Sequence, residues 1–72
     1  MIEFIGYCRY DQFSCDYIIV KYYGDQHIAI ETLKILCSDL SGGDDEALAA
    51  ADSLLMLDKL GFIEIIRLKE YE

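Results

Sequence analysis

The chain has 72 residues, 54% of them hydrophobic and none of them proline, and this apolar content predicts one compact domain over residues 1–72 rather than disorder. Six basic residues are set against fourteen acidic ones, so the net charge is −8 at pH 7. Such an excess of acids disfavours nucleic acid and anionic membranes as direct partners and favours a protein partner with a basic surface.

Cysteine count and apolar run lengths predict a cytoplasmic protein. Three cysteines, an odd number, argue against a closed disulfide framework and for a reducing compartment. No apolar run approaches the roughly 18 residues that a membrane span needs. Residues 1–5 contain neither a basic segment nor a cleavage site, so no secretory signal is expected.

Two strands are predicted first. Residues 2–10 place Ile2, Phe4 and Cys8 on one face and other apolar residues on the opposite face. Residues 11–14 are polar enough to turn the chain. Residues 17–23 are almost all β-branched or aromatic, which is the strongest strand pattern in the sequence. We therefore expect a hairpin with a four-residue connection.

The next segment has two interpretations. Gly24 can take the positive φ of a tight turn, after which residues 26–30 alternate like a short third strand. The alternative is that Asp25 caps a helix that starts at Gln26. The alternation favours the strand.

From Thr32 onward the apolar spacing becomes helical, and Thr32 or Glu31 can start this helix. Its apolar stripe consists of Ile30, Leu33, Leu36, Cys37 and Leu40. Residues 41–43, Ser-Gly-Gly, are expected to end the helix, because glycine accepts the left-handed conformation past a helix end.

A second helix is predicted over residues 47–60, opened by three acids. Asp44 is the expected cap, because its carboxylate can accept hydrogen bonds from free backbone N–H groups. Asp45 and Glu46 suit the positive end of the helix dipole. Gly61 suits the left-handed position that closes the helix.

This second helix is apolar on two sides. The broad face that we expect to be buried consists of Ala47, Ala50, Ala51, Leu54, Leu55 and Leu57. A second strip, formed by Ala49, Met56 and Leu60, lies opposite. Such a helix is either buried between two layers of structure or uses its second apolar strip to bind a partner.

Residues 62–69 are predicted to form the last strand, followed by a charged tail at residues 70–72. Apolar side chains occupy both faces of this strand, as in a central strand. The predicted order is ββ(β)ααβ. It indicates an α+β fold in which two helices pack on one face of a small antiparallel sheet.

The sequence predicts no metal, no cofactor and no enzymatic activity. Cys8, Cys15, His27 and Cys37 lack the close Cys pairs that zinc sites use. A Cys15–His27 nucleophile pair would have no third group to orient it. The acids near Asp44 lack the alternating carboxylates of a calcium-binding loop.

Residues 51–64, a Leu-rich helix that ends in Leu-Gly before a strand, resemble the recognition helix and first wing strand of winged-helix DNA-binding domains. The resemblance covers about a fifth of the chain. On the face that would enter the major groove, this chain has Glu46, Asp52 and Ser53 and no Arg, Asn or Gln to read bases. DNA binding is therefore not expected.

Size, charge and compactness resemble, in kind, phage-encoded inhibitors such as anti-CRISPR or anti-restriction proteins, which act inside a bacterial or infected host cell. The predicted function is accordingly that of a small acidic inhibitor or adaptor that occupies a basic, nucleic-acid-binding type of surface on a partner protein. Tyrosines add rigid contact area. The candidate contacts are Asp39, Asp44, Asp45, Glu46, Asp52, Tyr22 and Tyr23. The alternative is a homodimer through the second helix or an edge strand.

Overall fold

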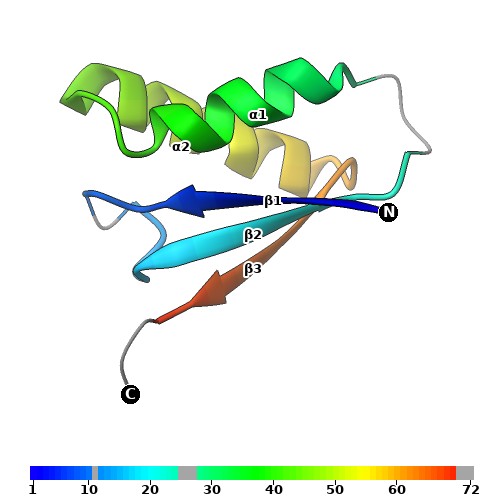
Figure 1. Ribbon diagram of the computed structural model, residues 1–72, viewed down its shortest axis with the longest axis horizontal. Coiled ribbons are helices and arrows are strands. Elements are labelled where there is room, and N and C mark those ends of the chain that lie inside the picture. The colour runs from blue at the N-terminus through cyan, green and yellow to red at the C-terminus, as the bar shows by residue number, and fades with distance from the viewer. Residues whose placement is uncertain (11, 25–27, 70–72) are drawn as a thin grey trace.

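The computed structural model describes residues 1–10, 12–24 and 28–69. Its elements in chain order are β1 (Ile2–Tyr7), β2 (Tyr17–Tyr22), α1 (Ile30–Asp39), α2 (Asp44–Lys59) and β3 (Glu64–Leu68). The strands form one antiparallel sheet in the order β1-β2-β3, and both helices lie on the same side of it (Figure 1). The predicted α+β fold, with two helices on one face of a small antiparallel sheet, is confirmed.

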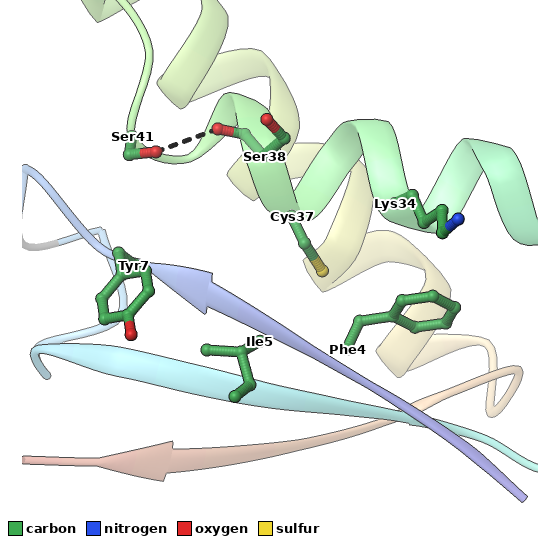
Figure 2. A pocket seen from close by; sticks show the side chains of 7 residues that line it. All are labelled: Phe4, Ile5, Tyr7, Lys34, Cys37, Ser38 and Ser41. Atoms are coloured by element: carbon green, nitrogen blue, oxygen red, sulfur yellow. Dashed lines mark hydrogen bonds between the residues drawn. The ribbon is translucent and has the colours of Figure 1, made fainter.

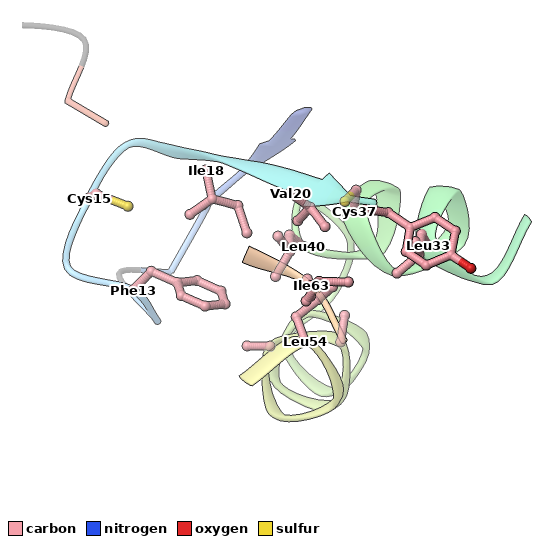
Figure 3. Packing of buried hydrophobic residues seen from close by; sticks show 12 residues of the cluster. Phe13, Cys15, Ile18, Val20, Leu33, Cys37, Leu40, Leu54 and Ile63 are labelled. Carbon is pink, nitrogen blue, oxygen red and sulfur yellow. The ribbon is translucent and has the colours of Figure 1, made fainter. Parts of the chain in front are cut away.

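The core fills the space between the sheet and the two helices (Figure 3). On the central strand β2, every second side chain is buried against the helices, because successive side chains of a strand point to opposite faces. These side chains belong to Ile18, Val20 and Tyr22. The largest fully buried side chains facing them from the helices are those of Leu33, Leu40 and Leu54.

Helix α1 buries the predicted stripe only in part. Leu33, Cys37 and Leu40 are buried, whereas Ile30, the first helical residue, is exposed. The chain leaves α1 without a left-handed glycine, because Gly24 and Gly61 are the only glycines of positive φ in the described residues. Instead, the backbone N–H and the hydroxyl of Ser41 both donate to the carbonyl of Ser38, which closes the last turn.

The start of α2 differs from the prediction. Asp44 is already the first helical residue, and the N-cap position belongs to Gly43, which offers no side-chain hydrogen bond. An aspartate with helical backbone angles cannot act as the cap, because the capping residue must have extended geometry. The capping prediction for Asp44 is therefore wrong.

The end of α2 agrees with the prediction. Gly61 has φ +83°, the left-handed conformation expected past the last turn. The N–H of Phe62 donates to the carbonyl of Leu57 at 2.9 Å, and the N–H of Gly61 donates to Asp58 at 3.0 Å. These two bonds make a Schellman motif. On the predicted buried face of α2, Leu55 is exposed, which is a further correction.

Two strand predictions also change. At the predicted third strand, residues 25–27 lie outside the described residues, Ile28 and Ala29 belong to no strand, and Ile30 is helical. The last strand β3 is an edge strand and not a central one, since among the described strands it pairs with β2 alone. Within residues 28–69 it also forms no wing hairpin, so the likeness to winged-helix domains does not extend to the described fold.

Candidate interaction surfaces

The predicted contact residues do not form one surface. Asp44, Asp45 and Glu46 are exposed in the first turn of α2. Asp39 is half-buried in the last turn of α1, and Asp52 is exposed farther along α2. At the turn between the helices, the Glu46 carboxylate lies against Gly42, whose N–H donates to the backbone carbonyl of Asp39 at 2.9 Å.

The two tyrosines lie elsewhere and point in opposite directions. Tyr22 pairs with Ile2 at the end of the sheet where β1 begins. Its side chain is 5% exposed in the core, so it is not available to a partner. Tyr23 is 52% exposed, and its hydroxyl donates to the Glu64 carboxylate at 2.7 Å. Only Tyr23 of this pair belongs to the molecular surface.

The acids at the start of α2 have local contacts. The Arg9 guanidinium donates to the carbonyl of Gly42 at 3.3 Å and lies over the ring of Tyr10, 5.2 Å from its centre. A hydrogen bond to the Asp44 carboxylate raises the pKa of Tyr10 above its ordinary value. The segment after β1 is thus joined to the start of α2. The Asp44 carboxylate therefore already has a hydrogen-bond partner within the molecule.

A larger feature lies on the opposite side of the sheet, which neither helix covers (Figure 1). The strand register aligns the outward side chains in three rows that cross the sheet. The rows are Glu3-Lys21-Glu64, Ile5-Ile19-Ile66 and Tyr7-Tyr17-Leu68. We call these nine residues the open face.

The open face has one charged end and an apolar remainder. In the charged row, Lys21 Nζ lies 3.9 Å from the Glu3 carboxylate. In the aromatic row, the Tyr7 and Tyr17 rings are 5.9 Å apart and tilted by 40°, a geometry that favours contact between aromatic rings. Ile5 is 57% exposed and Tyr7 63% exposed. The remaining apolar residues of the open face, Tyr17, Ile19, Ile66 and Leu68, are half-buried.

The open face was not among the predicted sites, although its signal is present in the sequence. Apolar residues on both faces of residues 62–69 predict a strand that is buried on both sides. Two helices can cover only one face of a three-stranded sheet, so the second apolar face stays exposed. A contiguous exposed apolar face of this kind is typical of an interaction site.

A hollow of about 360 Å³ lies beside the open face, between α1 and the outer edge of β1 (Figure 2). Phe4, Ile5 and Tyr7 line it from the strand. Lys34, Cys37, Ser38 and Ser41 line it from α1 and the turn that follows. The Cys37 side chain points from the helix toward β1, and Lys34 supplies an ammonium group at the rim.

A second hollow, of about 480 Å³, lies between the helices. Its lining residues are Thr32, Leu36, Asp52, Ser53, Met56 and Leu57. Met56 and Leu60, from the predicted second apolar strip of α2, are both more than half exposed. That strip is therefore a second apolar surface in the helical layer.

Two of the three cysteines have raised pKa values. Burial, followed by the neighbouring Cys15, raises the pKa of Cys8 to about 12, and burial raises the pKa of Cys37 to about 11. A thiol must lose its proton to attack, so these two are poor nucleophiles near neutral pH. No group of three metal-ligating side chains exists among the described residues, which exclude His27.

In residues 1–10, 12–24 and 28–69, no helix has both the length and the apolar composition needed to cross a membrane. Comparisons with known proteins identify no relative of this chain. The chain matches no protein-family model, no curated protein and no solved structure.

Proposed function

We propose that the protein is a non-enzymatic protein-binding module that uses the open face as its main contact surface. The supporting observation is the isoleucine row Ile5-Ile19-Ile66, flanked by Tyr7 and Tyr17, on a sheet face without a covering layer. Burying apolar area contributes about 25 cal/mol per Å². Partial burial of these side chains in a complex therefore provides a driving force that the free protein does not use.

The size of the open face limits how it can act alone. Three strands spaced about 4.8 Å apart and roughly 20 Å long give a footprint of roughly 300 Å². Stable specific complexes bury about 800 Å² on each partner. A partner must therefore also contact an adjoining edge or helix, or else form a transient complex.

Charge favours a basic partner. The net charge of −8 attracts positively charged surfaces over several ångströms and speeds encounter with them. The open face itself contains Glu3, Lys21 and Glu64, so most of the negative charge lies outside it. The apolar rows supply contact area, and the surrounding carboxylates favour partners of opposite charge.

Affinity capture with matched variants tests the open face. The double variant Ile19→Thr/Ile66→Thr keeps β-branched residues in both strands and removes apolar area from the face. Leu48→Gln removes an exposed leucine from α2 and is the control. We expect a protein captured from a bacterial lysate by wild type and Leu48→Gln to be lost at least tenfold with the double variant. Equal capture by all three folded proteins would reject the open face.

A narrower form of this proposal is an inhibitor of anti-CRISPR or anti-restriction kind that occupies a nucleic-acid-binding groove of its partner. It is supported by the exposed acids Asp44, Asp45, Glu46 and Asp52. Binding should then weaken with added salt, and duplex DNA should compete for the partner. A complex that forms equally well in excess DNA would leave the protein-binding module but remove the groove-blocking role.

Self-association through α2 is the second candidate function, because Met56 and Leu60 present an exposed apolar strip. Light scattering should then report a dimer at micromolar concentration that Met56→Glu dissociates. A monomeric wild type, or a dimer that Met56→Glu leaves intact, would rule out this helix-mediated contact.

A further inference from the structure

The free edge of β1 has hydrogen-bonding groups at defined positions. The N–H of Cys8 donates to the carbonyl of Asp16 at 2.9 Å, one step beyond the Tyr7–Tyr17 pair. In antiparallel strands, residues that exchange such bonds alternate with residues that do not. Counting back from Cys8, the residues whose N–H and C=O point away from β2 are Glu3, Ile5 and Tyr7.

These backbone groups have no partner in the turns, loops or caps of the described chain. They lie next to the hollow between β1 and α1, which Ile5 and Tyr7 also line (Figure 2). A strand placed along this edge would direct alternate side chains to the two faces of the sheet. One set would lie beside Ile5 and Tyr7 on the open face, and the other would enter the hollow below α1.

A second copy of the chain does not fit this edge. Helix α1 lies directly on β1, because a Cβ placed on Gly6 would be 3.5 Å from the Cα of Cys37 and 3.3 Å from its carbonyl oxygen. Pairing β1 with its copy would bring the strands about 4.8 Å apart and their α1 helices to a similar separation. Packed helices need about 8–10 Å between axes, so the two helices would collide. A strand without a helix above it avoids this collision.

We propose that β1 binds an extended peptide segment of another protein by strand addition, with one side chain seated in the hollow below α1. This inference rests on the proposed protein-binding function and names the chemistry of the partner. Backbone bonds to Glu3, Ile5 and Tyr7 supply affinity, while the hollow and the open face select side chains.

The local chemistry defines the peptide further. Phe4 and Cys37 accept a small apolar or hydroxyl side chain, and Ser38 offers a hydrogen-bonding group at the rim. Side chains on the open face extend the isoleucine and tyrosine rows, which favours β-branched or aromatic residues. The exposed carboxylate of Glu3, together with the net charge of −8, favours Lys or Arg at that end of the peptide.

Peptide selection followed by variants with altered backbone tests the strand addition. Random seven-residue peptides displayed on phage are selected on wild type, synthesised and titrated by NMR. Ile5→Pro removes the outward N–H together with part of the side chain, and proline is tolerated on an edge strand in that orientation. Ile5→Val keeps the N–H and is the matched control. We expect Ile5→Pro to weaken the selected peptides about tenfold and Ile5→Val to change their affinity less than twofold.

A second pair of variants gives an answer if Ile5→Pro fails to fold. Ser38→Trp fills the hollow from the α1 side, and Ser38→Ala leaves it open. Peptide binding should be lost with the first variant and kept with the second. In parallel, selection on Glu3→Gln should remove the enrichment of Lys and Arg.

Three results would overturn the strand addition: no selected peptide, equal affinity of Ile5→Pro and Ile5→Val, or unaltered binding to Ser38→Trp. Lysate capture with Ile19→Thr/Ile66→Thr is scored separately from these titrations. Capture that depends on the open face, combined with any of the three results, rejects only the peptide site. Capture that is independent of the open face rejects the broader proposal.

Discussion

Gly6 determines how closely α1 approaches the sheet. A methyl group at this position would come within 2.7 Å of Cδ1 of the fully buried Leu40. We expect Gly6→Ala to lower the free energy of unfolding by about 1–3 kcal/mol, measured by urea denaturation, because the core must shift to admit the methyl group. Leu40→Val removes the opposing carbon. Leu40→Val should therefore destabilise the Gly6→Ala variant less than it destabilises wild type. Strictly additive effects of the two substitutions would contradict the contact.

Cys8 gives a prediction for alkaline pH. Burial and the neighbouring Cys15 raise its pKa from 9.0 to about 12 in the folded protein. The unfolded chain loses this proton near pH 9, while the folded protein retains it. The contribution of Cys8 to stability is therefore complete below pH 9 and is lost as the pH rises toward 12. Urea unfolding at pH 8 and pH 11 should show a smaller drop for Cys8→Ala than for wild type. An equal drop would contradict the buried thiol.

At the scale of elements, α2 separates two roles of acidic residues. Asp45 lies in the first turn, where a negative charge interacts favourably with the helix dipole, whereas Asp52 is exposed in mid-helix. We expect Asp45→Asn to destabilise the protein by about 0.3–1 kcal/mol at low salt. Asp52→Asn, its control, should be neutral or slightly stabilising because it reduces charge repulsion. Equal changes in Tm for Asp45→Asn and Asp52→Asn would show that interaction with the helix dipole does not account for the effect of Asp45.

Local sequence patterns predict the types of all five elements, but they also predict a strand over residues 26–30, where Ile28 and Ala29 belong to no strand and Ile30 is helical. Alternation identifies β1, and the β-branched and aromatic content of residues 17–23 identifies β2. The helical spacing of Leu33 and Cys37 identifies α1, and Gly61 marks the end of α2. Capping is harder to predict, because the sequence does not show which of Gly43 and Asp44 takes the extended backbone conformation of the N-cap. Because successive side chains of a strand alternate between faces, Tyr22 is buried and Tyr23 is exposed, so only one of these two predicted contacts can meet a partner.

Local sequence patterns do not predict the order of the strands in the sheet. Ile65 aligns with Val20 across the sheet although both helices separate them in sequence. Only such distant contacts place β3 at the edge of the sheet. The candidate site depends on the same information, because the open face and the hollow exist only once β1, β2, β3 and α1 are placed in space.

Net charge acts on the whole molecule. The chain has fourteen acidic and six basic residues, so the excess negative charges repel one another in the folded state. Dissolved ions screen this repulsion. Raising NaCl from about 0.02 M to about 0.5 M at pH 7 should therefore raise the Tm by a few degrees. Near the isoelectric point, about pH 4.3, the same addition should have much less effect. Equal salt effects at both pH values, measured by calorimetry, would rule out net repulsion as the cause.

The place of β3 in the sheet has a consequence for the order of folding. β1 and β2 are neighbours in sequence and can pair early, whereas β3 reaches β2 only after a chain segment that includes both helices. Until it does, β2 has an unpaired edge, and the core lacks Ile63 and Ile65. Such an intermediate can join strands of other molecules. Refolding yield should therefore fall as protein concentration rises, and a synthetic peptide with the β3 sequence should compete for the vacant edge.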